Sequence, residues 1–214
     1  MAKAKKAPQI ELPSSHDWRT TDEDEINRRR ARAQTEEFRI VNTDARHPIF
    51  SNFRVQSGSG LTYLVEIRDL RQRQFACECV DFRINGLGTC KHVEALLMHL
   101  QARFKRLFQA AAKSGTPRLD LVPDPANGSV RLLNGNGSCP RAIKAWFEPD
   151  GTFRNGHVEE MLEALKQLSA SEAPELRLSQ ELDPWLQARQ RATERKQLRR
   201  EYELKADQWR TGAL

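Results

Sequence analysis

The sequence lacks the features of membrane and secreted proteins. Among its 214 residues, no apolar run approaches the ~18 residues needed to cross a membrane, and cysteine occurs only four times. Residues 1–6 are basic but are not followed by the apolar segment of a secretory signal, so we expect a cytoplasmic protein with no membrane partner. In such a reducing compartment, cysteines serve as thiols or metal ligands rather than as disulfides.

The sequence also lacks the motifs of a nucleotide-driven motor. No G-x-x-x-x-G-K-[ST] loop is present, since the Gly-rich run at residues 135–138 contains no lysine. No Asp-Glu box occurs apart from the acidic run at residues 22–25, and no Ser/His/Asp or paired-carboxylate arrangement stands out. We therefore expect no catalytic residues in this chain and no enzyme activity.

Positive charge is modestly in excess and is concentrated near the cysteines. Lys plus Arg total 35 against 29 acidic residues, which gives a net charge of +6. Residues 51–110 hold nine basic and five acidic side chains, together with three of the four cysteines. This excess is compatible with nucleic-acid binding without establishing it.

Periodicity predicts an α+β fold. Strands are expected at residues 38–41, 49–55, 61–67 and 74–77, and in the second half of the chain at 119–122, 130–133, 145–147 and 176–178. Helices are expected from residue 21 and at residues 90–108, 157–168 and 184–204. In the first helix, acids precede a cluster of arginines. These arginines either contact phosphate or form a solvated face that suits the helix dipole.

The predicted elements divide the chain into four segments. Residues 1–45 form a leader with the charged helix and the first strand, and residues 46–110 form a small β-meander followed by a helix. Residues 111–180 form a second small α+β domain. Residues 181–214 form a long charged helix.

Four residues of the meander segment have the spacing of a metal site. Cys77-x-Cys79 and, after ten intervening residues, Cys90-x-His92 supply three thiolates and one imidazole. This is a complete tetrahedral set for Zn²⁺, and a site with no open position is structural. Residues i and i+2 of an extended chain share a face, so the first pair can address one ion from the end of a strand. We predict one structural zinc ion.

The other cysteine and histidines are not expected to be ligands. Cys139 is isolated in a Gly-rich turn, and His99 is expected to be a surface or packing residue. His16, His47 and His157 carry no ligand spacing.

Residues 75–97 resemble a SWIM zinc finger, whose pattern is C-x-C followed by C-x-H. The similarity includes Asp-Phe-Arg at residues 81–83, Asn-Gly-Leu-Gly at 85–88 and Cys-Lys-His at 90–92. The stretch is most similar to the finger near the N-terminus of bacterial Swi/Snf-family helicases. It departs from that pattern at Glu78 and Val80, neither of which is a ligand.

The resemblance implies a non-motor module in the bacterial cytosol or nucleoid. Such a finger binds DNA or protein and serves a Swi/Snf-type ATPase motor, either in the same polypeptide or as a separate subunit. On this interpretation, residues 181–214 connect the module to the motor.

Two hypotheses follow for the partner. The first is DNA, bound by the basic side chains Arg54, Arg71, Arg73, Arg83, Lys91, Arg103, Lys105 and Arg106. The cations at 103–106 also suit the end of a helix, which explains them equally well. The second hypothesis is a protein-interaction or autoregulatory module that docks on the motor through the charged helix. Arg191, Arg195 and Arg199 recur there every four residues, and a solvated connector is the alternative.

Overall fold

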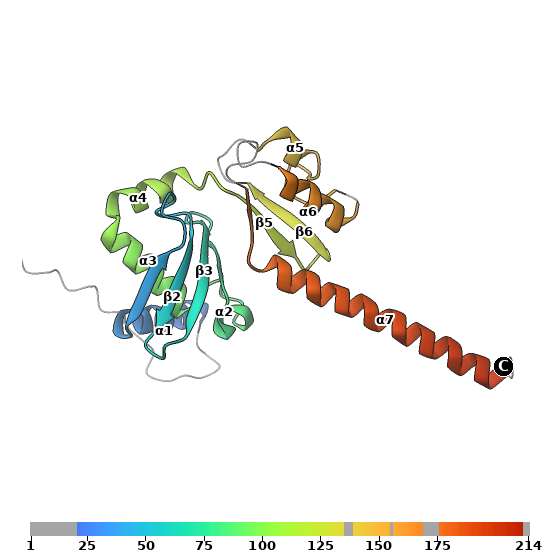
Figure 1. The fold of residues 1–214 in the computed structure, drawn as a ribbon. Coiled ribbons are helices and arrows are strands. Elements are labelled where there is room, and N and C mark those ends of the chain that lie inside the picture. The colour runs from blue at the N-terminus through green and yellow to red at the C-terminus, as the bar shows by residue number, and fades with distance from the viewer. Residues whose placement is uncertain (1–20, 135–138, 155, 169–175, 212–214) are drawn as a thin grey trace, which may run out of the picture. The chain divides into compact units, whose positions relative to one another are not determined.

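The computed structural model describes residues 21–134, 139–154, 156–168 and 176–211. The chain forms two compact units, Met1–Arg118 (unit 1) and Leu119–Leu214 (unit 2). Each unit has its own hydrophobic core. Both contain helices and strands, which confirms the predicted α+β class (Figure 1).

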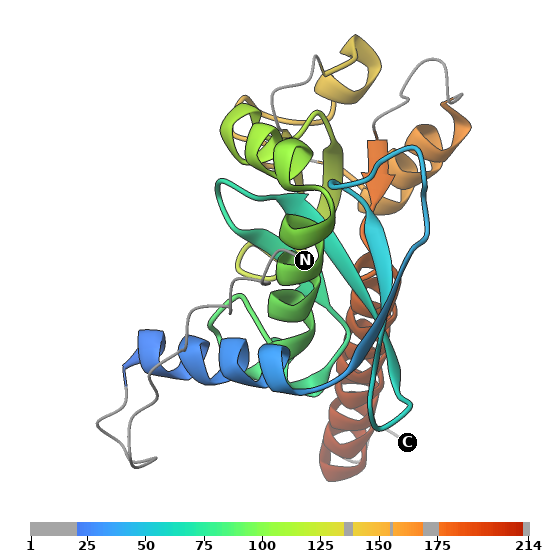
Figure 2. The same ribbon diagram turned by 90° about the vertical axis from the view of Figure 1, so that its left-hand side faces the viewer.

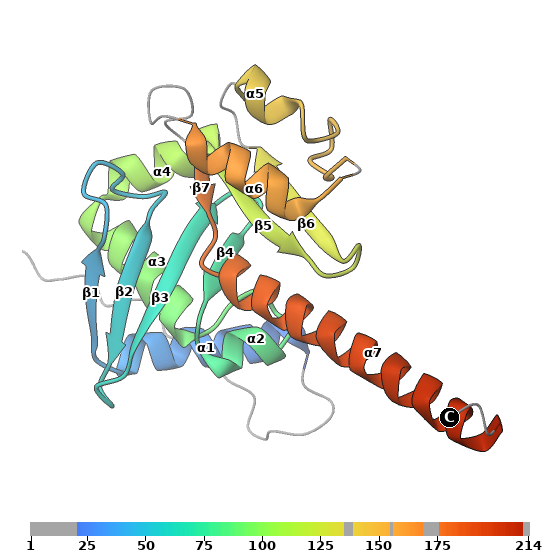
Figure 3. The same ribbon diagram turned by 45° about the vertical axis from the view of Figure 1, so that its right-hand side comes forward.

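Unit 1 is built on a four-stranded antiparallel meander (Figure 3). Its strands, in spatial order, are β1 (Phe38–Asn42), β2 (Asn52–Ser57), β3 (Thr62–Asp69) and β4 (Gln74–Cys77). The register places Phe53 opposite Val65 and Val65 opposite Cys77, so these side chains share one face of the sheet. That face is buried, and it ends at Cys77, the first of the four predicted metal ligands.

Helix α3 (Lys91–Arg103) covers the apolar face of the meander with Val93, Leu96 and Leu100. The helix predicted over residues 90–108 is present but is interrupted at one residue, Phe104. The backbone leaves helical geometry at Phe104 (φ −124°, ψ 42°) and resumes as α4 (Lys105–Ser114). Phe104 and residues of α4 pack against the same core, so the break keeps the chain on that core.

Helix α1 (Asp22–Thr35) packs against α3 and crosses it near the N-terminal end of α3 (Figure 2). Thr21 caps α1 in a capping box with Asp24, and the first turn is acidic, as the sequence predicts. Helix α1 and strand β1 thus belong to the same unit as the meander. The predicted boundary after residue 45 falls between two strands of one sheet, and the boundary after residue 110 falls within α4.

Unit 2 contains a three-stranded sheet in the order β6-β5-β7. Strand β5 (Leu119–Asp124) pairs antiparallel with β6 (Ser129–Asn134) and parallel with β7 (Leu176–Leu178). Helix α6 (Val158–Gln167) contributes its apolar side chains to the core of this unit. The strand predicted at residues 145–147 is wrong, because the short helix α5 (Arg141–Lys144) precedes a turn and only Phe147 makes a bridge, to Phe153.

Helix α7 (Leu182–Thr211) begins in the core of unit 2 and then leaves it. Leu182 is buried, and Trp185 and Leu186 pack against the same cluster, whereas every residue from 187 to 211 is exposed. The helix predicted at residues 184–204 is therefore present and is longer. None of the helices in the described ranges has the length and apolar character needed to span a membrane.

Gly151→Ala is expected to destabilise unit 2. Gly151 has φ +83°, and a Cβ atom there would lie 2.1 Å from the carbonyl oxygen of Leu132, whose N–H donates to the Gly151 carbonyl. Strain and clash together predict a loss of about 3 kcal/mol in the free energy of unfolding, measured by urea denaturation. Gly128→Ala is the control, because Gly128 has φ +59° but open space around it, and its expected cost is about 1 kcal/mol. Equal losses for the two variants would contradict the assignment.

Candidate metal centre

The structure brings Cys77, Cys79, Cys90 and His92 together in the interior of unit 1. Their ligand atoms all lie within 4.8 Å of one another, and all four residues are buried. Cys77 ends β4, and Cys79 is the N-cap of α2 (Val80–Ile84). Cys90 is the N-cap of α3, and His92 lies in the first turn of that helix. The placement at a strand end and a helix start follows the sequence prediction.

The spacing of the donor atoms suits one tetrahedral metal ion. Nδ1 of His92 lies 3.8 Å from Sγ of Cys90 and 4.0 Å from Sγ of Cys77. Metal–sulfur bonds of ~2.3 Å and metal–nitrogen bonds of ~2.0 Å in a tetrahedron place sulfur and nitrogen about 3.6 Å apart. The observed separations exceed that value by only a few tenths of an ångström, so the four side chains fit one ion.

The thiols perturb one another strongly. The pKa of Cys77 is raised by its hydrogen bonds with Cys79 and Cys90 and by burial. The pKa of Cys79 is lowered, because its sulfur accepts hydrogen bonds from the other two thiols and from the backbone N–H of Phe82. One thiolate is thus favoured and further thiolates are opposed, so a cation is needed to hold all three sulfurs in the anionic form.

Two aromatic rings fix the imidazole of His92. The ring of Tyr63, on β3, lies 4.5 Å from it between centroids, and the ring of Phe38, on β1, lies 5.9 Å away edge-on. Nε2 of His92 is buried without a hydrogen-bond partner among the described residues, so on that side of the ring aromatic packing rather than a polar contact orients the imidazole. The sheet therefore positions the imidazole directly.

Glu94, two residues beyond His92, connects three elements around the cluster. Its carboxylate accepts hydrogen bonds from Thr89 Oγ1 at 2.7 Å, Arg73 Nη2 at 3.0 Å and Arg30 Nε at 3.4 Å. The Glu94 side chain is only 5% exposed, so these partners compensate for the burial of its charge. Arg73 holds a left-handed backbone conformation (φ 53°) at this contact.

Helix α1 is joined to the ligand-bearing segments by two further ion pairs. Arg29 makes a bidentate pair with Asp81 of α2, at 2.6 and 3.1 Å. Lys91, between two ligands, pairs with Glu36 at the end of α1. Arg29 and Arg30 are therefore bound to acids of other elements, whereas Arg32 is exposed and pairs with Glu36 at the end of its own helix. The sequence did not identify these partners, although an acid at position 94 of an otherwise apolar helix face was a signal.

The predicted nucleic-acid residues fall into two groups. Lys91 and Arg73 are committed to ion pairs with acids of their own unit. The remaining six are exposed and are distributed over several elements: Arg54 on β2, Arg71 in the β3–β4 turn, Arg83 on α2, and Arg103, Lys105 and Arg106 around the α3–α4 junction. Only the junction brings three of them together.

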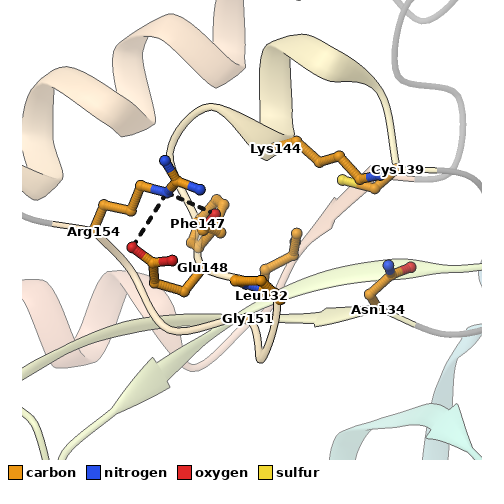
Figure 4. A pocket seen from close by; sticks show the side chains of 9 residues that line it. Leu132, Asn134, Cys139, Lys144, Phe147, Glu148, Gly151 and Arg154 are labelled. Carbon is orange, nitrogen blue, oxygen red and sulfur yellow. Dashed lines mark hydrogen bonds and ion pairs between the residues drawn. The ribbon is translucent and has the colours of Figure 1, made fainter.

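Cys139 lies apart from the metal cluster, at a cavity of about 280 Å³ in unit 2 (Figure 4). Burial raises the pKa of its thiol. Arg154, on the opposite wall, donates to the carbonyl of Phe147 and pairs with Glu148. Among the described residues, the only group of three or more candidate metal ligands is the one in unit 1, so Cys139 has no ligand partners there.

Comparisons with protein-family models, with curated proteins and with solved structures give no match to this chain.

Glu94→Gln is expected to loosen unit 1 without removing its metal. The substitution keeps the shape of the side chain but leaves Arg30 and Arg73 without their shared anion, which predicts a loss of about 2–3 kcal/mol in urea denaturation of the metal-loaded chain. The control is Glu37→Gln, at an exposed position, which should stay within ~0.5 kcal/mol of the unsubstituted chain. If Glu94→Gln were as stable as the control, Glu94 would not be the hub described above.

Proposed function

We propose that this chain is a zinc-stapled accessory module of a Swi/Snf-family ATPase and that it contacts DNA without catalysis. The observation that carries the proposal is the closed cluster of Cys77, Cys79, Cys90 and His92, whose four donors leave no position for a substrate. When bound, Zn²⁺ supplies charge that stabilises three thiolates and a cross-link between β4, α2 and α3. The resemblance of residues 75–97 to a SWIM finger supplies the link to the ATPase.

Zinc is the metal that this donor set favours. Three thiolates and one imidazole are soft and borderline ligands, which select Zn²⁺ over the oxygen-seeking Mg²⁺ and Ca²⁺. Structural zinc in small domains contributes apparent free energies of ~10–16 kcal/mol. A unit with a small core therefore depends heavily on the ion.

Elemental analysis of the purified chain is expected to give one zinc per chain. Cys90→Ser should lose it, whereas Cys139→Ser, the same chemical change outside the cluster, should retain it. Chelation should also abolish hydrogen-exchange protection at Val93 and Leu96 but leave it at Leu121 and Met161, because those residues lie in separate cores. Unchanged protection at Val93 and Leu96 after metal removal would contradict a structural role.

DNA is the partner that the surface charge of unit 1 favours. The exposed cations at the α3–α4 junction have no carboxylate partner among the described residues, and Arg103 lies over the ring of Phe104. Contacts to phosphates by such side chains are independent of base sequence and are weakened by salt.

Docking on the ATPase motor is the second candidate, supported by a different observation. Val80 and Ile84 lie one turn apart on α2 and are 61% and 77% exposed. Apolar side chains held outward beside a rigid metal cluster are typical of a protein contact. The two activities use different residues of the same unit.

The zinc-loaded chain is expected to bind a 20-base-pair DNA duplex with an affinity that falls as salt rises. The triple variant Arg103→Gln, Lys105→Gln, Arg106→Gln (the junction triple) should reduce the slope of log affinity against log salt by about 2.7, at ~0.9 per phosphate contact. Fluorescence anisotropy at several salt concentrations measures it. Absence of binding at low salt would remove DNA as the partner and leave motor docking as the function.

A further inference from the structure

The largest uncompensated charge in the described chain lies on α7, outside the unit that holds the metal cluster. Residues 189–200 of α7, here called the basic segment, carry six basic side chains and one acid, Glu194, for a net charge of +5. The rest of the helix, residues 201–211, carries two basic and three acidic side chains. The positive charge is thus confined to about 18 Å of helix.

The charge is also confined to one side. At about 100° per residue, the six cations occupy an arc of roughly 180°, which also includes Ala192, while Gln190, Glu194 and Gln197 lie on the opposite side. The cations are Arg189, Arg191, Arg195, Lys196, Arg199 and Arg200. The one acid of the segment, Glu194, lies outside this arc, so the arc presents six cations with no acid of the segment among them, which suits an anionic partner.

These cations are more available than those of α1. Arg199 pairs with Glu203, and Arg191 donates to the carbonyl of Gln187. Arg195, Lys196 and Arg200 have no hydrogen-bond or ion-pair partner among the described residues. By contrast, Arg29 and Arg30 of α1 are 14% and 29% exposed in their side chains and are bound to acids of other elements.

A second copy of the chain does not suit this surface. If two α7 helices paired along the stripe that contains Leu198 and Tyr202, Arg191, Arg195 and Lys205 would lie in the same seam. Positions 192, 199 and 206 on one side of the seam hold no acid, and Glu194 and Glu201 on the other side offset only two of the four cations at 191, 195, 199 and 205, so each helix would bring a net positive charge to the contact. The occupant must supply the negative charge itself.

We propose that the basic segment of α7 binds duplex DNA by lying in the major groove. A helix with its side chains is about 10–12 Å across, and the major groove of B-DNA is about 12 Å wide. Every residue from 187 to 211 is exposed, so both groove walls can reach the helix. A cationic arc of roughly 180° faces the phosphates of both walls, and Glu194 faces away from the DNA. The proposal shares with the proposed function only the identity of the partner as DNA.

Two single substitutions test which side of α7 contacts the DNA. Ala192→Glu and Gln197→Glu add the same charge at exposed positions of the same helix, but the first lies within the cationic arc and the second lies opposite it. In the zinc-loaded chain, Ala192→Glu should weaken binding of a 20-base-pair duplex tenfold or more, and Gln197→Glu less than about threefold. Circular dichroism verifies that both variants keep the helix. Equal weakening by the two variants would overturn the proposal.

Removal of charge tests the contact with phosphates, and an RNA duplex tests the fit to the major groove. The triple variant Arg195→Gln, Lys196→Gln, Arg200→Gln should lower the salt slope by about 2.7. Duplex RNA of the same length should bind far more weakly than DNA, because its major groove is too narrow to admit a helix. Equal binding of duplex RNA, or competition by poly-glutamate as effective as that by unlabelled DNA, would overturn the proposal; the second result would assign the helix to an acidic protein.

The two triple variants separate this inference from the proposed function. An effect of the α7 triple alone supports the basic segment and removes the junction from the proposed DNA contact. An effect of the junction triple alone overturns the basic segment and leaves the proposed function intact. Effects of both triples support two contact surfaces.

Discussion

The rest of unit 1 is arranged around one constraint, the burial of three sulfurs and an imidazole in a single cluster. Cys77, Cys79 and Cys90 come from three different segments, and within 4.8 Å of one another they favour one thiolate and oppose further ones. A divalent ion at this cluster would cross-link the end of β4, the start of α2 and the start of α3. It would also hold both ends of the segment between the second and third cysteines, from which Phe82 packs against the core.

The surroundings of the cluster show how a small sheet can hold such a site rigidly. His92 is set by the rings of Phe38 and Tyr63, from β1 and β3. Glu94 joins Arg30 of α1, Arg73 of the β3–β4 turn and Thr89 of the loop before α3. The segment that precedes β2, with α1 and β1, is therefore a structural component of the Cys/His cluster. A fragment that began at β2 would lack both the ring contact from Phe38 and the arginines of α1.

The two arginine-rich helices of this chain differ in what their arginines contact, and the difference depends on whether acids of other elements lie nearby. In α1, Arg29 and Arg30 pair with Asp81 and Glu94, which belong to other elements of unit 1. In α7 the cations of the basic segment project from a helix whose contact with its core ends at Leu186. Helix α1 balances four arginines with four acids, whereas α7 carries eight basic and five acidic side chains, so only α7 has an excess of cations to offer a partner.

The sequence alone determined which four residues form the Cys/His cluster, the strand-to-helix order around it and the apolar face of α3. Each depends on local spacing: i, i+2 pairs for the cysteines, and i, i+3, i+4 for Val93, Leu96 and Leu100. Tertiary structure decided what depends on residues distant in the chain. It broke the predicted 90–108 helix at Phe104, replaced the strand at 145–147 with a turn, and paired Lys91 and Arg73 with acids. Local pattern specifies which way a side chain points, whereas only the packed chain specifies what it meets there.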